Sequence, residues 1–175
     1  MRNRIIQVYV HPVATPVGPL TMVAEGDAIS GCYWDPNDKR IGAACQHDAA
    51  SDALLKEATR QLHSYFAGRL RAFDLPLAPH GSAFQIRVWD ALQTISYGEV
   101  VSYTAIARAI GAPTAVRAVG TANGRNPLSI FIPCHRVIGE DGSLRGYAGG
   151  LQAKAWLLDR ERSGNLVRQS NLGPP

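Results

Sequence analysis

The chain has 175 residues, of which 46% are hydrophobic and 18% are charged, a composition typical of a soluble globular protein that excludes a disordered or fibrous chain. None of its apolar runs approaches the ~18–20 residues of a membrane-spanning helix, so no membrane partner is expected. The net charge of +4 is concentrated in residues 100–175, where nine Lys and Arg accompany four Asp and Glu, and this excess fits an anionic partner or an ordinary solvated face equally well.

The first half of the chain predicts a small sheet covered by one helix. Short β-branched or alternating runs at Ile5–Val10, Leu20–Ala24 and Ile29–Trp34 are separated by turn-forming residues, a pattern typical of an antiparallel meander. Apolar residues then recur at helical spacing over Ala49–Gly68, which predicts an amphipathic helix against that sheet. The proline-containing run Phe73–Pro79 is expected to connect this half to the next.

The second half predicts helices. Ser82 and Gln85 form a capping-box pattern at the start of one helix, and Ser102 can cap another. Residues 111–114 end that second helix and lead into a third over Thr114–Ala122. Two helices joined by a short glycine-containing turn are the helix-turn-helix pattern, in which the second helix enters a groove of DNA.

This helix pair has two interpretations, because an αα-hairpin that only packs is the commoner structure. Two observations favour DNA binding over such a packing hairpin. The segment Val100–Gly139 contains four arginines and no acidic residue, and the second helix has small residues such as Ala115 and Ala118. A helix with small side chains can approach a duplex closely but reads few bases, so it would bind DNA with little sequence specificity. Such binding suits an enzyme that inspects any sequence better than a transcription regulator.

Cys134 is either a buried core residue or a nucleophile. Free cysteine is among the most buried residue types, which favours the core. Adjacent side chains of a strand point to opposite faces, so His135 could assist Cys134 only if the chain turns there, and Pro133 makes a turn plausible. A carboxylate would have to orient such a histidine, and Glu161 and Asp159, on a further helix predicted over Lys154–Arg162, are both candidates.

The sequence Pro133-Cys134-His135-Arg136-Val137 is one of an ordered set of short motifs in the second half. The others are Phe84-Gln85, Val88-Trp89, Gly98-Glu99, Ser102-Tyr103, Arg117-Ala118-Val119-Gly120, Asn126-Pro127, Gly146-Tyr147, Gly149-Gly150 and Trp156-Leu157-Leu158. On this set the chain closely resembles the family of O6-alkylguanine-DNA alkyltransferases, which repair DNA by direct reversal. The resemblance covers residues 82–162 and, more loosely, the meander and helix before them.

The resemblance implies a fold of the α/β (α+β) class with two domains. Residues 1–79 would form a ribonuclease-H-like domain, residues 80–165 the helical DNA-binding and alkyl-acceptor domain with its helix-turn-helix, and residues 166–175 a flexible tail. It also implies a single-turnover enzyme of the methylated-DNA–protein-cysteine S-methyltransferase class, acting as a monomer in the cytoplasm. Three widely spaced cysteines, an odd number, agree with a reducing compartment.

The resemblance also gives roles to the catalytic residues. Cys134 would accept the methyl or alkyl group from O6 of guanine in an irreversible displacement, and His135, backed by Glu161, would take the thiol proton through a water. Tyr103, assisted by Lys154, would protonate the departing guanine at N3, because guanine leaves poorly as an anion. No cofactor is required. Whether longer alkyl groups or O4-methylthymine are accepted stays open.

Contacts with double-stranded DNA are implied in the minor groove. Arg117 would enter the base stack and fill the space of the flipped nucleotide, whose extrusion costs about a few kcal/mol. Further DNA contacts would come from Ser102, Thr114, Ala115, Ala118, Asn123 and Arg125. The guanine would be held by Val137, Tyr147 and Ala148, and Asn126 would tie the recognition helix to the cysteine turn. Whether molecules bind DNA cooperatively stays open.

Two features depart from the family pattern. Many relatives have serine where Ala148 stands, so a hydroxyl contact to the base is lost. The zinc site of some relatives has no counterpart, because Cys32, Cys45 and His47 are scattered and do not make a tetrahedral set, so no metal is expected. Two other functions fit less well: a non-catalytic alkylguanine-binding protein would lack Cys134, and a Cys–His hydrolase would need neither the basic stretch nor a DNA-binding helix.

Overall fold

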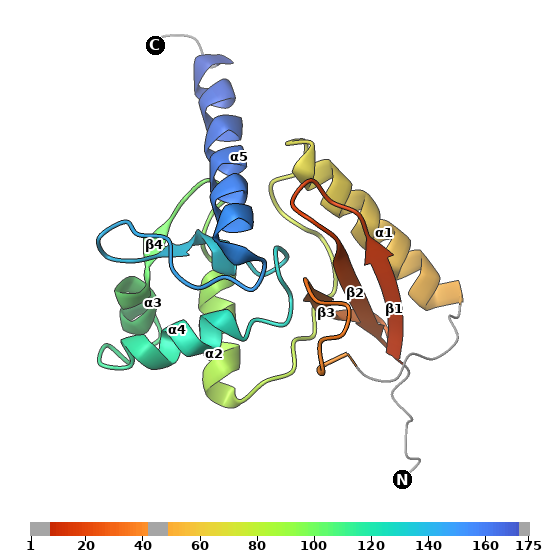
Figure 1. The fold of residues 1–175 in the computed structure, drawn as a ribbon, viewed down its shortest axis with the longest axis horizontal. Helices are drawn as coiled ribbons and strands as arrows, with labels where there is room; N and C mark the ends of the chain where they lie inside the picture. Colours follow the sequence, from red (N-terminus) through yellow and green to blue (C-terminus); the bar gives the residue numbers. More distant parts are fainter. Residues whose placement is uncertain (1–7, 42–48, 172–175) are drawn as a thin grey trace. The chain divides into compact units, whose positions relative to one another are not determined.

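A computed structural model describes residues 8–41 and 49–171, and the chain divides into two compact units (Figure 1). The first unit comprises Met1–His80 together with Pro127–Phe131, and the second comprises Gly81–Asn126 and Ile132–Pro175. Within the described ranges, no helix combines the length and the apolar character needed to cross a membrane.

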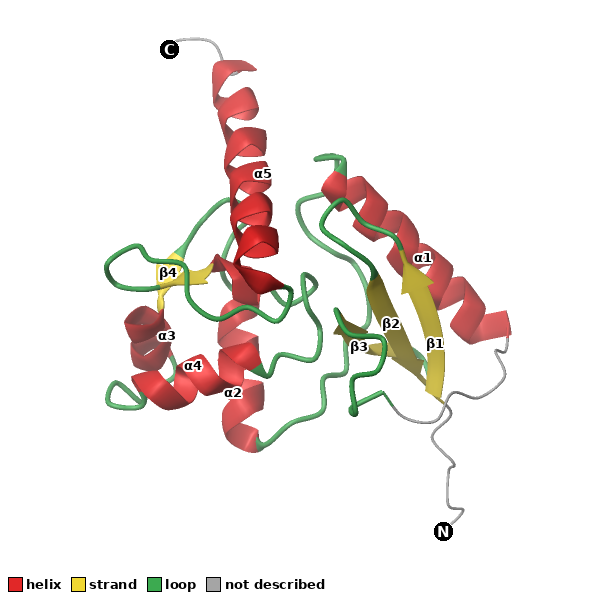
Figure 2. Cartoon of the chain, in the orientation of Figure 1, coloured by secondary structure: helices red, strands yellow, loops and turns green. Residues whose placement is uncertain are grey.

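The first unit is an antiparallel sheet covered by one helix (Figure 2). Strands β1 (Val8–Val13), β2 (Leu20–Glu25) and β3 (Ala28–Tyr33) pair in that order, and helix α1 (Ala49–Phe66) contacts all of them. The predicted meander and helix are confirmed. Strand β1 continues through Pro12 to Val13, beyond its predicted end, because proline is tolerated in a strand at the edge of a sheet, and the predicted start of this strand, residues 5–7, lies outside the described residues.

A segment from the second half of the sequence completes the first unit. Residues 127–131 run beside β3, where the Cys32 N–H donates to the carbonyl of Pro127 at 2.7 Å and the Ser129 N–H donates to the carbonyl of Cys32 at 3.1 Å. An apolar run shows that a segment is buried but not which sheet it joins, so the sequence did not predict this pairing. The segment leads directly into the turn that carries Cys134.

The second unit is mainly helical. Its elements are α2 (Ala83–Gln93), α3 (Tyr103–Ala109), α4 (Val116–Gly124) and α5 (Gly150–Asn171), with a short parallel pairing of β4 (Val101–Ser102) and β5 (Val137–Ile138). The capping box of Ser82 and Gln85 is present at α2, with both hydrogen bonds formed. Ser102 Oγ accepts from the Ala105 N–H at the start of α3. Both predicted caps are confirmed.

Helices α3 and α4 form the predicted helix-turn-helix, and α2 packs against both. The Trp89 indole N–H donates to the carbonyl of Ala122 at 2.9 Å, which fixes α4 on α2. Helix α4 begins later than predicted, because the Ala115 N–H donates to the Ala112 carbonyl in a turn. Pro113 therefore lies in this turn, before the helix.

The last helix, α5, is longer than expected. It continues to Asn171, so residues 166–171, which were expected in a flexible tail, are helical, and the remaining residues of that predicted tail, 172–175, lie outside the described residues. No Gly or Pro interrupts residues 165–171, which allows the helix to continue. Further back in α5, a Cβ at Gly164 would meet the Tyr97 hydroxyl oxygen at 3.0 Å. The Tyr97 ring can approach α5 because this position has no side chain.

Candidate active site

Cys134 lies in a tight turn and not in a strand. Residues Cys134–Arg136 form a single 3₁₀ turn, in which the Cys134 N–H donates to the Ile132 carbonyl at 2.8 Å and the Arg136 N–H donates to the Pro133 carbonyl at 3.0 Å. Consecutive side chains of such a turn do not alternate between two opposite faces as they do in a strand. Cys134 is 4% exposed, so its thiol is nearly closed to water.

A buried carboxylate orients the histidine beside this cysteine. His135 Nε2 lies 3.0 Å from Glu161 Oε1, and both residues are fully buried. Of the two carboxylates that the sequence left open, Glu161 therefore contacts the histidine, whereas Asp159 is exposed on α5. Glu161 also accepts from Nε and Nη2 of Arg136 and from the N–H of Gly98, each at 2.9 Å. These contacts hold the carboxylate in one orientation.

Burial and hydrogen bonding shift the pKa values of the three groups in different directions. Burial raises the pKa of the Cys134 thiol, although a hydrogen bond from the Asn126 side chain opposes the rise. Burial lowers the pKa of His135, against the pull of Glu161. Burial alone would raise the pKa of Glu161, but hydrogen bonds, that from His135 foremost, lower it to about 2. At neutral pH the site holds a thiol, a neutral imidazole and a carboxylate.

Tyr103 and Lys154 share one hydrogen-bond acceptor. The Tyr103 hydroxyl donates to the carbonyl of Arg145 at 3.2 Å, and the Lys154 ammonium donates to the same carbonyl at 2.8 Å. Lys154 also donates to the carbonyl of Val137 at 2.6 Å. Burial raises the pKa of Tyr103 and lowers the pKa of Lys154 to about 8. Both groups therefore carry a proton at neutral pH, as a proton donor must.

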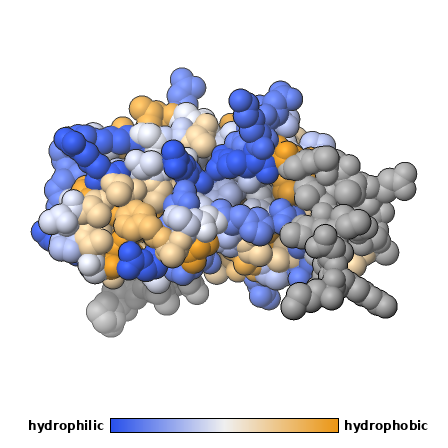
Figure 3. All heavy atoms as spheres, turned by 90° about the horizontal axis from the view of Figure 1, so that it is seen from below, coloured by the Kyte–Doolittle hydropathy of each residue, from blue (hydrophilic) through white to orange (hydrophobic). Residues whose placement is uncertain are grey.

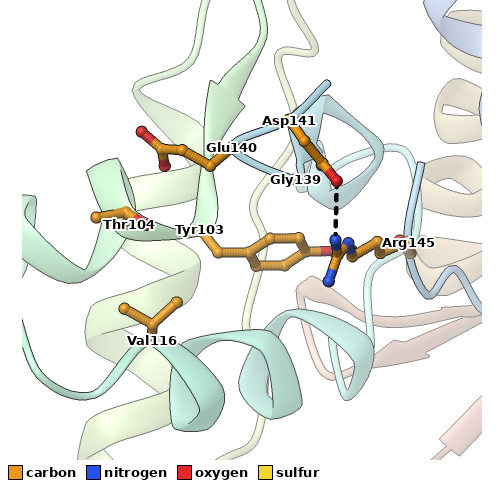
Figure 4. A pocket seen from close by; sticks show the side chains of 7 residues that line it. All are labelled: Tyr103, Thr104, Val116, Gly139, Glu140, Asp141 and Arg145. Atoms are coloured by element: carbon orange, nitrogen blue, oxygen red, sulfur yellow. Dashed lines mark hydrogen bonds and ion pairs between the residues drawn. The ribbon is translucent and has the colours of Figure 1, made fainter. Parts of the chain in front are cut away.

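A cavity of about 350 Å³ opens beside Tyr103 (Figure 4). It is lined by Tyr103, Thr104, Val116, Gly139, Glu140, Asp141 and Arg145. The Tyr103 ring extends into this region with the Arg145 side chain at its hydroxyl end, and Arg145 forms an ion pair of 3.1 Å with Asp141. The cavity wall carries the carboxylates of Glu140 and Asp141 and the guanidinium of Arg145, whereas Cys134, Val137 and Tyr147 are not among the lining residues.

Helix α4 and its two ends present mostly small residues to solvent. Thr114, Arg117, Ala118, Thr121, Gly124 and Arg125 are exposed, and Ala115 is half-buried. Figure 3 shows the molecule from the side on which α3 and α4 lie in Figure 1, and there a pale to orange area is bordered by hydrophilic atoms. A duplex could approach such a surface closely, with Arg117 in the first turn of α4 as a long side chain beside it.

Two asparagines tie the end of α4 to the cysteine turn. Asn126 Nδ2 donates to the carbonyl of Ile132, two residues before Cys134, at 2.9 Å. Asn123 is 2% exposed, and its Nδ2 donates to the carbonyl of Cys134 at 3.4 Å. The prediction that Asn123 contacts DNA is corrected by this burial, because its side chain is turned toward the protein interior.

The other residues predicted to contact DNA or the guanine differ in how far they are buried. Ser102 is half-buried. Its hydroxyl oxygen accepts from the Ala105 N–H, as the cap of α3, and the hydroxyl also bonds the Glu140 carboxylate. Val137 is buried, and the ring centroids of Tyr147 and His135 lie 6.4 Å apart in an edge-on contact. Ala148 is exposed.

Three residues around the site were not predicted: Gly98, Arg136 and Arg145. Gly98 ends the turn after α2 with φ 80, a conformation that glycine adopts readily, and this directs its N–H to Glu161. The sequence counted Arg136 among the arginines suited to DNA, and only its place beside His135 in the motif hinted at another use. Arg145 takes part through its backbone carbonyl, which leaves no signal in a side-chain pattern.

No cluster of metal-ligating side chains is present among the described residues. Cys32 is buried in β3. Cys45 and His47, the other ligands considered from the sequence, lie outside the described residues.

Comparison with known families gives two matches that follow one another along the chain. Residues 8–79 match the family model described as 6-O-methylguanine DNA methyltransferase, ribonuclease-like domain. Residues 83–163 match the family model described as 6-O-methylguanine DNA methyltransferase, DNA binding domain. The second match contains the helix-turn-helix, the cysteine turn and Glu161.

Relatives of the whole chain agree with these matches. A methylated-DNA–protein-cysteine methyltransferase of Methanosarcina acetivorans is 45% identical over 149 residues, which are 85% of this chain and 95% of the relative. The constitutive protein of that name from Bacillus subtilis is 46% identical over 159 residues, 88% of this chain and 95% of the relative. The crystal structure of Mycobacterium tuberculosis OGT in complex with DNA is similar with a TM-score of 0.81 and 44% identity, covering 89% of this chain and 94% of that one.

Proposed function

The chain belongs to the 6-O-methylguanine DNA methyltransferase family, and we propose that it repairs alkylated DNA by direct reversal, with Cys134 as the residue that receives the alkyl group. The observation that carries this assignment is the buried turn in which Cys134 precedes a histidine held by a carboxylate. A cysteine next to an oriented base is the arrangement of an activated nucleophile. Cys32, by contrast, is buried within a strand of the first unit.

In the proposed transfer the Cys134 sulfur attacks the carbon bound to guanine O6, the carbon–oxygen bond breaks, and a thioether forms. The thiol proton passes through a water to the neutral His135, and the ionised Glu161 stabilises the imidazolium that results. Because the thioether is stable, each molecule acts once.

The leaving guanine requires a proton, and we assign its delivery to Tyr103. Burial keeps the Tyr103 hydroxyl protonated until the reaction, and Tyr103 shares its acceptor with Lys154, which also bonds the carbonyl of Val137. The Lys154 ammonium, on the same carbonyl as Tyr103, favours the tyrosinate that forms when the proton leaves. Tyr147 and the backbone of Val137 and Ala148 would hold the guanine edge.

DNA would bind to the second unit through the minor groove. O6 of guanine lies inside the duplex, so the nucleotide must be flipped out, and Arg117 at the exposed start of α4 would fill the space that it leaves. Exposed residues of α4 and of the turn before it, Thr114, Ala118 and Arg125, would contact the backbone. We assign DNA binding and nucleotide flipping to the domain of residues 80–165. We also propose that the protein acts as a monomer in the cytoplasm.

Transfer should persist to pH values below 6.5. His135 is a base only when neutral, and burial lowers its pKa from the ordinary 6.5, so falling pH protonates it late. The rate constant of transfer from the free base O6-methylguanine, which needs no DNA binding, should therefore show an acid limb whose midpoint lies below pH 6.5. A His135→Asn variant should be slower and should lack this acid limb. An acid limb centred at or above pH 6.5 in the unaltered protein would contradict this role.

The stoichiometry of repair tests the proposed function. A duplex that carries one O6-methylguanine, supplied in excess over reduced protein, should lose one methyl group per protein molecule, and the reaction should then stop. Multiple turnovers would exclude transfer to the protein. Absence of repair would reject the function.

A further inference from the structure

Arg136 follows the cysteine and the histidine in sequence, but its side chain is directed into the protein and is 6% exposed. Nε and Nη2 each donate to a different oxygen of Glu161 at 2.9 Å, and Nη1 donates to the carbonyl of Ile95 at 2.6 Å. The guanidinium carbon also lies 5.9 Å from the centre of the Tyr97 ring. Each nitrogen of this guanidinium thus has an acceptor inside the second unit, so its charge is not directed to DNA.

The Arg136 guanidinium determines how Glu161 meets the histidine. Both carboxylate oxygens accept from Arg136, and Oε2 accepts in addition from the Gly98 N–H, so Oε1 is the oxygen that faces His135 Nε2. A paired guanidinium favours the ionised form of a carboxyl group, and an ionised carboxylate can only accept hydrogen bonds. His135 Nε2 must then carry the proton. The lone pair is left on Nδ1, which is also buried.

We propose that Arg136 is a positioning residue for alkyl transfer: through Glu161 it holds His135 in the tautomer with the proton on Nε2, so that Nδ1 takes the thiol proton. This inference rests on the proposed roles of Cys134 and His135. The S–H bond breaks and its proton moves to Nδ1 through the water, while the sulfur electron pair forms the bond to the alkyl carbon. The electrons of the broken carbon–O6 bond stay with guanine, which is protonated by Tyr103.

Removal of Arg136 should change the proton position on His135. Without the guanidinium, the buried Glu161 can take up one proton from solvent and donate it in a hydrogen bond to Nε2, and the single proton of the neutral imidazole then sits on Nδ1 instead of Nε2. A histidine in that tautomer cannot accept the thiol proton at Nδ1. The positioning role of Arg136 would therefore be visible both in the tautomer of His135 and in the rate of alkyl transfer.

The test reads the His135 tautomer by ¹⁵N NMR of the full-length protein, together with the rate of transfer from free O6-methylguanine. The unaltered protein should show the proton on Nε2. Arg136→Met should show the Nδ1–H tautomer and a rate lower by about 10- to 100-fold, at or below the lower end of the ~10²–10⁴-fold that a general base supplies. Arg136→Lys keeps the positive charge and should restore the Nε2–H tautomer and part of the rate. Arg162→Met, at an exposed position on the same helix as Glu161, should change neither.

A double variant separates positioning from folding. If Arg136 acts through Glu161, adding Arg136→Met to Glu161→Gln should lower the rate by less than about twofold beyond Glu161→Gln alone. Additive losses, or an unchanged tautomer and rate in Arg136→Met, would overturn the proposal. If circular dichroism shows that Arg136→Met does not fold, Arg136→Lys with and without Glu161→Gln gives the same comparison. Failure of the unaltered protein to transfer any alkyl group would instead reject the proposed function, since the tautomer is read without substrate.

Discussion

Replacing Cys134 by serine is expected to abolish alkyl transfer and to leave DNA affinity nearly unchanged. A serine hydroxyl is a much weaker nucleophile than a thiol in the same place, so the rate should fall by a factor on the order of 10⁴ or more. Cys134 is 4% exposed and cannot contact a phosphate, so the dissociation constant for duplex DNA should stay within about twofold. Single-turnover repair assays and fluorescence polarisation measure the two quantities.

Cys32→Ser is the matched control for this variant. It makes the same atomic change at a buried cysteine, but in strand β3 of the first unit. Its rate of transfer per folded molecule should equal that of the unaltered protein. Measurable transfer by Cys134→Ser, or loss of transfer in folded Cys32→Ser, would remove Cys134 from its proposed role.

Replacing Arg117 by alanine is expected to slow repair of duplex DNA strongly and to spare the reaction with the free base. If Arg117 fills the stack in place of the flipped nucleotide, it offsets part of the few kcal/mol that extrusion costs. Loss of this stabilisation should lower the rate by about 10- to 10³-fold. Free O6-methylguanine needs no extrusion, so its rate should change by less than about twofold. The quantity to measure is the ratio of the duplex rate to the free-base rate.

Arg125→Ala gives the comparison for a phosphate contact. Arg125 is exposed at the end of α4, so its loss should weaken DNA binding modestly and reduce the salt dependence of the affinity by about one ion. With DNA at saturating concentration, Arg125→Ala should repair duplex at close to the unaltered rate, whereas Arg117→Ala should remain slow. An equal fall of the duplex and free-base rates in Arg117→Ala would mean that Arg117 shapes the pocket or the fold.

Patterns within single elements predicted much of the fold. Ser82 and Ser102 marked the starts of α2 and α3 because each side chain bonds the backbone of the turn that follows it. The alternating runs of the first half predicted the meander, and helical spacing predicted α1. The motif around Cys134, with its accompanying anchors, predicted DNA repair by alkyl transfer, and the family matches and relatives support that function.

Contacts between distant segments could not be predicted in this way. Spacing placed both Glu161 and Asp159 on the last helix, and only packing shows that Glu161 is turned toward His135. Asn123 follows directly on a predicted DNA-binding helix and was expected on the surface, yet its amide Nδ2 donates to the carbonyl of Cys134. Arg136 was counted with the basic stretch, yet its charge is paired with the buried carboxylate. In each case the partner is decided by tertiary structure, which composition and spacing do not contain.

The central claim is that the alkyl group moves from DNA to Cys134 itself, and the mass of the protein after reaction tests this most directly. The full-length protein, incubated with a duplex that contains O6-methylguanine, should gain the mass of one methyl group, ~14 Da. Tandem mass spectrometry of its peptides should place the whole gain on Cys134. A gain on Cys32 or any other residue, or repaired DNA with no gain in protein mass, would contradict the account.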